Sequence, residues 1–191
     1  MLALTAAAVT GVVFGGVAGA AAGSTCAGAK RRKPKFLKQV KVEGHGQVAV
    51  HTQVKHKNVH VTLDSEALLG VPDLPFCSAV VAPDGTIYVS GVVAAEKRSD
   101  GEPGIVAGGP EDEVVKILEI IDATLRACGA TKDDITMVHA FLVNYTDENF
   151  ALMNRGYLKY WKGTAPPARI CTGTDRVGLR GNVELDVIAH L

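Results

Sequence analysis

Residues 166–191 read PPARICTGTDRVGLRGNVELDVIAHL and predict two β-strands, around ARICTGT and NVELDVIAH. The second run alternates one apolar set with a partly charged set, Val183, Leu185 and Val187 against Glu184, Asp186 and Ile188. Alternation with a period of two predicts a strand with one face in the core and the other against something polar. Charges on a half-buried strand cost free energy unless they are paired or used. Arg169 and Glu184 are therefore candidate functional residues.

The segments before these strands alternate between strand and helix patterns. A hairpin is predicted where two β-rich runs flank Pro83-Asp84-Gly85, and residues 95–109 form a polar, Gly-rich loop. The first helix begins at Pro110, with acids in its first turn, and ends at Gly129. The remaining predicted elements are a strand over 134–145 (DITMVHAFLVNY) and a helix over 146–161 (TDENFALMNRGYLKYW).

The predicted order is ββαβαββ, which is an α+β domain with a mixed sheet and two helices packed on one face. Helices on one face leave the other face of the sheet in need of cover. A neighbouring subunit is the expected cover, so the sequence predicts a homo-oligomer.

Charge is distributed unevenly along a chain whose formal net charge is zero. Residues 30–41 contain seven basic side chains and no acidic one, whereas residues 60–191 carry 11 Lys and Arg against 19 Asp and Glu, or 11 − 19 = −8. Phosphate binding requires a basic surface. The acidic body therefore argues against a nucleic-acid partner.

The N-terminal 29 residues contain no charged side chain and precede the run KRRKPK. A stretch of this length can cross a hydrocarbon core as a helix, and the basic flank would keep the domain on the cytoplasmic side. A cleaved signal, with a lumenal or secreted domain, is the alternative. We expect a hydrophobic segment at 1–29 (anchor or signal), a basic, His-rich linker at 30–59 and a domain at 60–191.

The sequence lacks the motifs of several common catalytic and cofactor-binding sites. The chain has no Walker loop, GxSxG, HExxH or dinucleotide fingerprint. The four cysteines are scattered, without a CxxC pair, and the histidines between His45 and His60 do not follow metal-ligand spacing. We expect neither a metal nor an organic cofactor.

From about Leu74 to Leu191 the chain resembles the reactive intermediate deaminase family (Rid, or YjgF). The resemblance lies in LPFCSAVV, TIYVSGVV, ACGATKDDITMVHAFLVNYTDENFALMNRGYLKYW and above all PPARICTGTDRVGLRGNVELDVIA. In the last stretch the family's P-A-R-x-C is followed by an acid 15 residues after the arginine, which here gives Arg169 and Glu184. The resemblance implies the chorismate-mutase-like YjgF fold and a homotrimer whose pockets lie between subunits.

The resemblance also implies roles for particular residues. Arg169 would bind the carboxylate of a small 2-imino or 2-oxo acid, helped by the backbone N–H of Gly91 next to Ser90. Glu184 would activate the water that hydrolyses the imine, and the remaining pocket residues are Cys171, Asn154 and Phe76. On strand parity, an Arg169–Glu184 pair across neighbouring strands is geometrically reasonable. Asp186, Arg176 and Arg180 are expected to be structural or surface charges.

Two departures from the family pattern leave two functional expectations open. Many active members have a tyrosine where this chain has Phe76, and a serine where it has Cys77. The first expectation is a deaminase of reactive enamines and imines such as 2-aminoacrylate, 2-iminobutanoate and 2-iminopropanoate. The alternative is a non-catalytic trimer that binds small carboxylates or serves as a membrane-tethered scaffold.

Overall fold

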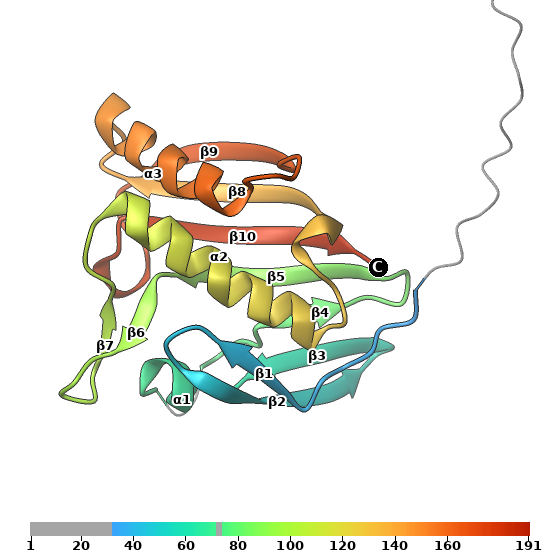
Figure 1. Ribbon diagram of the computed structural model, residues 1–191. Helices are drawn as coiled ribbons and strands as arrows, with labels where there is room; N and C mark the ends of the chain where they lie inside the picture. Colours follow the sequence, from blue (N-terminus) through green and yellow to red (C-terminus); the bar gives the residue numbers. More distant parts are fainter. Residues whose placement is uncertain (1–31, 72–73) are drawn as a thin grey trace, which may run out of the picture. The chain divides into compact units, whose positions relative to one another are not determined.

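The computed structural model describes residues 32–71 and 74–191 (Figure 1). The chain divides into the units Met1–Lys30 and Arg31–Leu191, and the first lies outside the described residues. In the second, the strands are β1 Gln39–Val42, β2 Gly46–Lys55, β3 Asn58–Leu63, β4 Ala79–Val81, β5 Thr86–Val93, β6 Ala95–Lys97, β7 Pro103–Ile105, β8 Ile135–Val143, β9 Ala168–Thr174 and β10 Val183–His190. The helices are α1 Ser65–Leu69, α2 Pro110–Ala127 and α3 Asp147–Tyr160, with 3₁₀ turns η1 Lys132–Asp134 and η2 Gly178–Arg180.

Eight of these strands form one sheet in the order β1-β2-β3-β4-β5-β10-β8-β9, and β6 pairs with β7 apart from it. All neighbours in the large sheet are antiparallel except β8 and β9, which are parallel and joined through α3. The C-terminal strand β10 is inserted between β5 and β8. Figure 1 shows α2 and α3 on the same face of this sheet. The predicted mixed sheet and the order ββαβαββ from β4 onward are confirmed.

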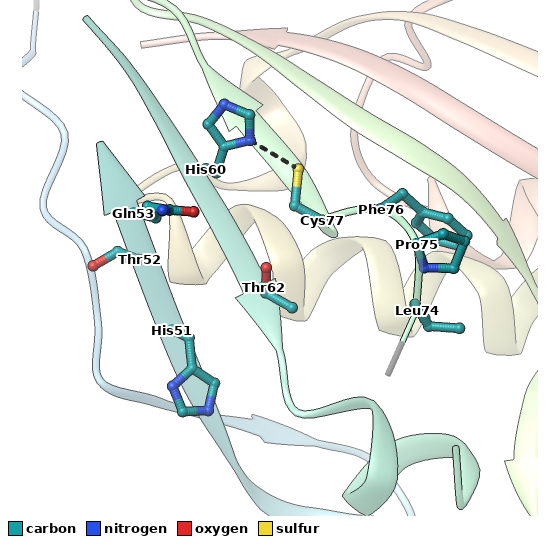
Figure 2. Close-up of a pocket in the computed structure, with 9 residues that line it drawn as sticks. All are labelled: His51, Thr52, Gln53, His60, Thr62, Leu74, Pro75, Phe76 and Cys77. Atoms are coloured by element: carbon teal, nitrogen blue, oxygen red, sulfur yellow. Dashed lines mark hydrogen bonds between the residues drawn. The ribbon is translucent and has the colours of Figure 1, made fainter. Parts of the chain in front are cut away.

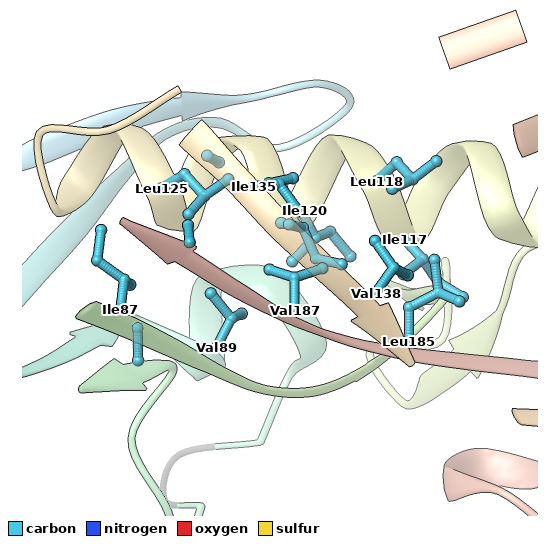
Figure 3. Close-up of a cluster of buried hydrophobic side chains, with 14 of the residues drawn as sticks. Ile87, Val89, Ile117, Leu118, Ile120, Leu125, Ile135, Val138, Leu185 and Val187 are labelled. Atoms are coloured by element: carbon cyan, nitrogen blue, oxygen red, sulfur yellow. The ribbon is translucent and has the colours of Figure 1, made fainter. Parts of the chain in front are cut away.

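The hydrophobic core lies between α2 and the sheet (Figure 3). The side chains of Ile117, Leu118 and Leu125 on α2 are fully buried, against strand residues such as Val138 and Leu185. Each such side chain contributes about 1.5–3 kcal/mol through removal from water. This core fixes the positions of β5, β10 and β8, which carry part of the candidate site.

Glycine sets both the end of α2 and its contact with α3. Gly129 has φ +83°, and a Cβ there would lie 2.7 Å from the backbone N of Lys35. A Cβ at Gly156 of α3 would overlap the carbonyl oxygen of Glu111 in α2. Since neither position has room for a side chain, glycine allows the two helices and the segment at Lys35 to pack closely.

The N-terminal part of the described chain differs from the prediction. The sequence predicts a linker over residues 30–59, but the structure places β1, β2 and the start of β3 there, as part of the sheet. Val40, Val42, Val48 and Val50 are buried at alternate positions between exposed lysines and polar residues. The basic and His-rich composition obscured this period of two. Likewise, the predicted loop at 95–109 contains the short hairpin β6–β7.

The segment predicted as an anchor or signal, residues 1–29, lies outside the described residues. Among the residues that the structure describes, no helix is long and apolar enough to cross a membrane.

The sheet face away from α2 and α3 is open in a single chain. It carries Tyr88 and Ile170, both about half exposed, and a contact of 2.6 Å between His139 Nδ1 and Asp186 Oδ1. Asp186 therefore has a protein partner, in agreement with its expected structural role. Cover of this face by a second copy remains a prediction.

Candidate functional site

A bulge in β5 brings its backbone against the Glu184 carboxylate. Val92 pairs with Leu185 and Val89 pairs with Val187, so two residues of β5, Ser90 and Gly91, oppose a single residue of β10. A Cβ at Gly91 would overlap Glu184 Oε1. Only glycine fits here, and its backbone therefore borders the carboxylate directly.

Ser90 fixes the segment that carries Phe76. The Ser90 hydroxyl donates to the carbonyl oxygen of Cys77 at 2.7 Å, and the Ser90 N–H donates to the carbonyl oxygen of Ser78 at 3.0 Å. The Ser78 hydroxyl in turn accepts from the Leu63 N–H at 3.0 Å. Ser90 therefore holds residues 76–78 beside the bulge, which is a positioning role in the single chain.

Glu184, Ser90, Gly91 and Phe76 line one cavity of about 400 Å³. β4 pairs with β5 as far as Val89, and the Ser90 N–H still bonds to the Ser78 carbonyl oxygen, so the edge of β5 on this side is free from Gly91 to Val93, and these residues line the cavity. Its remaining wall is largely apolar and includes Leu68 of α1, Ile120 of α2 and Leu179. A polar carboxylate in a mainly apolar cavity is the common composition of a small-molecule site.

A buried glutamate that the sequence reading missed sets the start of β10. Glu113 of α2 is 1% exposed and accepts from the Asn182 N–H at 2.7 Å and the Val183 N–H at 3.0 Å. It also accepts from the Asn182 side-chain amide. The sequence signal was an acid in the first turn of a helix, which is expected for its dipole alone. The structure shows instead that Glu113 anchors the residue before Glu184.

Arg169 lies in a second group, between β9 and α3. Its Nη2 donates to Asn154 Oδ1 at 2.7 Å, and its guanidinium carbon lies 4.6 Å from the ring centroid of Tyr157 and 5.9 Å from that of Phe150. Stacking and the amide acceptor hold the planar guanidinium in one orientation. Tyr157 and Phe150 therefore join Asn154 in the group around Arg169.

Cys171 lies two residues from Arg169 on the same face of β9, opposite Ala140 of β8. Burial raises the pKa of its thiol, and the nearby Arg169 charge only partly opposes this effect. A raised pKa keeps the thiol protonated and weakly nucleophilic near neutral pH. The raised pKa argues against a nucleophilic role for Cys171, and its place in a pocket wall stays a prediction.

The structure does not bring Arg169 and Glu184 together within one chain. β8 lies between β9 and β10, so the two strands are not neighbours as the parity argument assumed. Arg169 pairs with the buried Val138, on the helix face, whereas Glu184 pairs with Phe141, on the other face. The expected pair across neighbouring strands is therefore wrong. β8 lies between the two strands, and the register of each strand with β8 places the two side chains on opposite faces.

Metal binding finds no support in this part of the chain. Over residues 32–71 and 74–191, no group of three or more His, Cys, Asp and Glu side chains is arranged to hold a metal ion. The two groups of candidate residues described above are a carboxylate beside a backbone bulge and a separately held guanidinium.

Comparison with known proteins places this arrangement in a family. Residues 71–191 match the family model described as Endoribonuclease L-PSP. The structure of YyfA from Yersinia pestis, a protein of the conserved Rid family, is 30% identical, with a TM-score of 0.53 over 61% of this chain and 88% of that chain. Yeast Mmf1 is 26% identical, with a TM-score of 0.53 over 62% of this chain and 88% of its own.

The YjgF gene product of E. coli shares the fold at 22% identity, with a TM-score of 0.53 over 61% of this chain and 87% of that chain. The family model covers more than half of the present sequence and includes β4 to β10, which carry both groups of candidate residues. The chain therefore belongs to the Endoribonuclease L-PSP family, also known as the Rid/YjgF family.

Proposed function

We propose that this protein is a hydrolytic deaminase that converts reactive enamine and imine intermediates to 2-oxo acids and ammonia. Its substrates would be small 2-imino acids, including 2-aminoacrylate, 2-iminobutanoate and 2-iminopropanoate. The observation that carries the proposal is the Glu184 carboxylate against the Gly91 backbone in a mainly apolar cavity, together with an Arg169 guanidinium fixed by Asn154.

These groups match the steps of imine hydrolysis. Arg169 would bind the substrate carboxylate through its planar fork, and the Gly91 N–H would donate to the same carboxylate. Glu184 would accept a proton from a water molecule as that water adds to the imine carbon. The resulting carbinolamine loses ammonia and leaves the 2-oxo acid, so the net reaction consumes one water and needs no oxidant.

A second copy of the chain would complete the site. Since Arg169 and Glu184 lie on opposite faces of one sheet, one copy would contribute Arg169, Asn154 and Cys171 and its neighbour Glu184, Gly91 and Phe76. A homotrimer with three such interfaces satisfies this geometry. In a closed ring of three, each copy contributes its Arg169 group to one interface and its Glu184 group to the other. It would also cover the open sheet face with its exposed Tyr88 and Ile170.

The direct test is the decay of an imine produced in place by an amino-acid oxidase. Wild-type protein should accelerate hydrolysis over the spontaneous rate, whereas Arg169→Ala and Glu184→Ala should each lose most of this effect. Arg176→Ala is the matched control, because Arg176 is an exposed arginine outside both groups. If wild type and Arg169→Ala both accelerate hydrolysis equally little over the spontaneous rate, the deaminase proposal is wrong.

Phe76 favours a second candidate function, a non-catalytic trimer that binds small carboxylates or acts as a scaffold. Phe76 is 51% exposed at the cavity and lacks the hydroxyl of the tyrosine expected there. If that hydroxyl is needed to order the attacking water, this protein would still bind small carboxylates but would not hydrolyse imines. Titration calorimetry with 2-oxobutanoate beside the rate assay separates the two functions, because the scaffold binds at Arg169 without hydrolysing imines.

RNA cleavage, which the family description names, is less well supported than either candidate. The net charge of −8 over residues 60–191 opposes phosphate binding.

For localisation, we propose that residues 1–29 tether the domain to a membrane from its cytoplasmic side. The charge-free stretch before a basic run supports this proposal. An intact mass of the native protein distinguishes an anchor that is retained from a signal that has been cleaved.

A further inference from the structure

Strands β1, β2 and β3 lie before the family-matched region and extend its sheet. The matched region begins at residue 71, whereas these strands span residues 39–63. β3 pairs with β4 in register from Val59 opposite Val81 to Val61 opposite Ala79. The added strands therefore continue the open face of the sheet from β4 outward.

The added strands form one wall of a pocket on this open face. Val61 and Leu63 point into the core, so the alternate residues His60 and Thr62 point the other way, as do His51 and Gln53 of the paired strand β2. Figure 2 shows these side chains beside the segment Leu74–Cys77. Together they line a pocket of about 540 Å³.

The chemistry of this wall suits an anionic group. Among the described lining residues none is acidic, and those that face the pocket offer two imidazoles, the Gln53 amide and the Thr62 hydroxyl. Lys55 and Lys57 follow Gln53 by two and four residues along the chain, at the end of the β2–β3 hairpin. Donors without competing carboxylates favour a carboxylate ligand.

This pocket adjoins the Glu184 cavity through two shared residues, because Leu74 and Phe76 line both. In Figure 2 the Cys77 side chain points toward His60, with Sγ and Nδ1 3.6 Å apart, while the Phe76 ring points away from it. The consecutive side chains of Phe76 and Cys77 thus point toward the Glu184 cavity and the histidine pocket, respectively. A ligand in the Glu184 cavity that is long enough to pass Phe76 would reach the histidines.

We infer that the His51–His60 pocket is a specificity site that binds the second carboxylate of a dicarboxylic 2-imino acid. The inference rests on the proposed deaminase function, since Arg169 would bind the first carboxylate and Glu184 would act on the imine between the two. Residues His51, Gln53, His60 and Thr62 then select substrates by their distal acidic group.

The test compares two imines on the full chain. Iminosuccinate is produced from D-aspartate and 2-iminopropanoate from D-alanine, each by a flavin oxidase, and kcat/KM is measured for both. His51→Glu places a negative charge in the pocket and should lower the ratio of the iminosuccinate to the 2-iminopropanoate value by about tenfold or more. His56→Glu is the matched control, because His56 lies on the same hairpin but does not line the pocket.

A binding arm separates failure of the specificity site from failure of the proposed function. Calorimetry should show 2-oxoglutarate binding to wild type more tightly than 2-oxobutanoate, with the preference lost in His51→Glu and kept in His56→Glu. If imines are hydrolysed but the ratio changes equally in both variants, the specificity site is wrong and the deaminase stands. If no imine is hydrolysed yet the 2-oxoglutarate preference depends on His51, the pocket stands and the deaminase is wrong.

Discussion

Arg169 and Glu184 project from opposite faces of the same sheet, on strands separated by β8. Each is held by its own surroundings, Arg169 by Asn154 and the Tyr157 ring and Glu184 by the Gly91 bulge. A single chain therefore contains two groups of candidate residues that lie on opposite faces of the sheet. Under the proposed function, activity belongs to the interface between copies, and this leads to the first prediction.

Mixing two inactive variants should restore activity. Arg169→Ala and Glu184→Ala are each expected to be inactive, but a subunit of one beside a subunit of the other regenerates an intact interface. Random assembly of equal amounts after unfolding and refolding gives about one quarter of the wild-type activity, because each intact interface needs two independent choices. Imine hydrolysis before and after mixing measures this recovery. No recovery from refolded, well-assembled mixtures would place the whole site in one chain.

Gly91→Ala should displace the Glu184 carboxylate. The added Cβ would overlap Glu184 Oε1, so we expect a loss of about 10²-fold in kcat, comparable to the loss of one well-placed group at the reacting atoms. The control is the double variant with Glu184→Ala, in which the clash is gone. The two losses should then be far from additive; simple additivity would mean that Gly91 acts independently of Glu184.

Removing the Glu113 carboxylate should destabilise the start of β10. Glu113→Ala leaves the N–H groups of Asn182 and Val183 buried without their acceptor, which costs about 1–3 kcal/mol for each such group. Glu113→Gln keeps one side-chain oxygen and should recover part of the loss. Urea unfolding monitored by the fluorescence of Trp161 measures the free energy of unfolding. Equal stability of Glu113→Ala and wild type would show that water replaces the carboxylate.

Phe76→Tyr should raise the rate of imine hydrolysis if the missing hydroxyl orders the attacking water. The ring is 51% exposed and borders the Glu184 cavity, so a hydroxyl fits without repacking the core. The gain in kcat can reach about 10²-fold, the usual value of one positioned donor. Tyr88→Phe, on the same open face, is the control for a general aromatic effect. If the wild type already hydrolyses imines rapidly and Phe76→Tyr does not change that rate, the missing hydroxyl does not limit hydrolysis.

The described cysteines should react with iodoacetamide in a defined order at pH 8. Burial raises the pKa of Cys128 to about 12 and also raises the pKa of Cys171, so both hold less thiolate than a free thiol at this pH. Cys171 should be labelled slowly, and Cys128, which is fully buried, only after unfolding. Peptide mass mapping with time measures each rate. Labelling of Cys128 in the native protein at the rate of Cys171 would contradict this burial.

The sequence predicted α2, α3, β8, β9 and β10 well, since each carries a strong local signal such as Pro110 at a helix start or the alternation from Val183 to Val187. It failed at β1–β3, because lysines and histidines at the exposed positions concealed the buried valines Val40, Val42, Val48 and Val50. It also read Glu113 as an ordinary first-turn acid, since nothing local indicates that residues 182–183 lie against it.

By itself, the sequence determined the family, the element order after residue 78 apart from the β6–β7 hairpin, and the residue types that chemistry requires. Motifs and periodicities are local properties of the chain. Only the tertiary structure decided that β8 separates β9 from β10 and that Arg169 and Glu184 face opposite sides. Strand order depends on which distant segments pair, and the face of a side chain depends on register. Neither is encoded by residue spacing, so the separation of Arg169 from Glu184 became visible only in the fold.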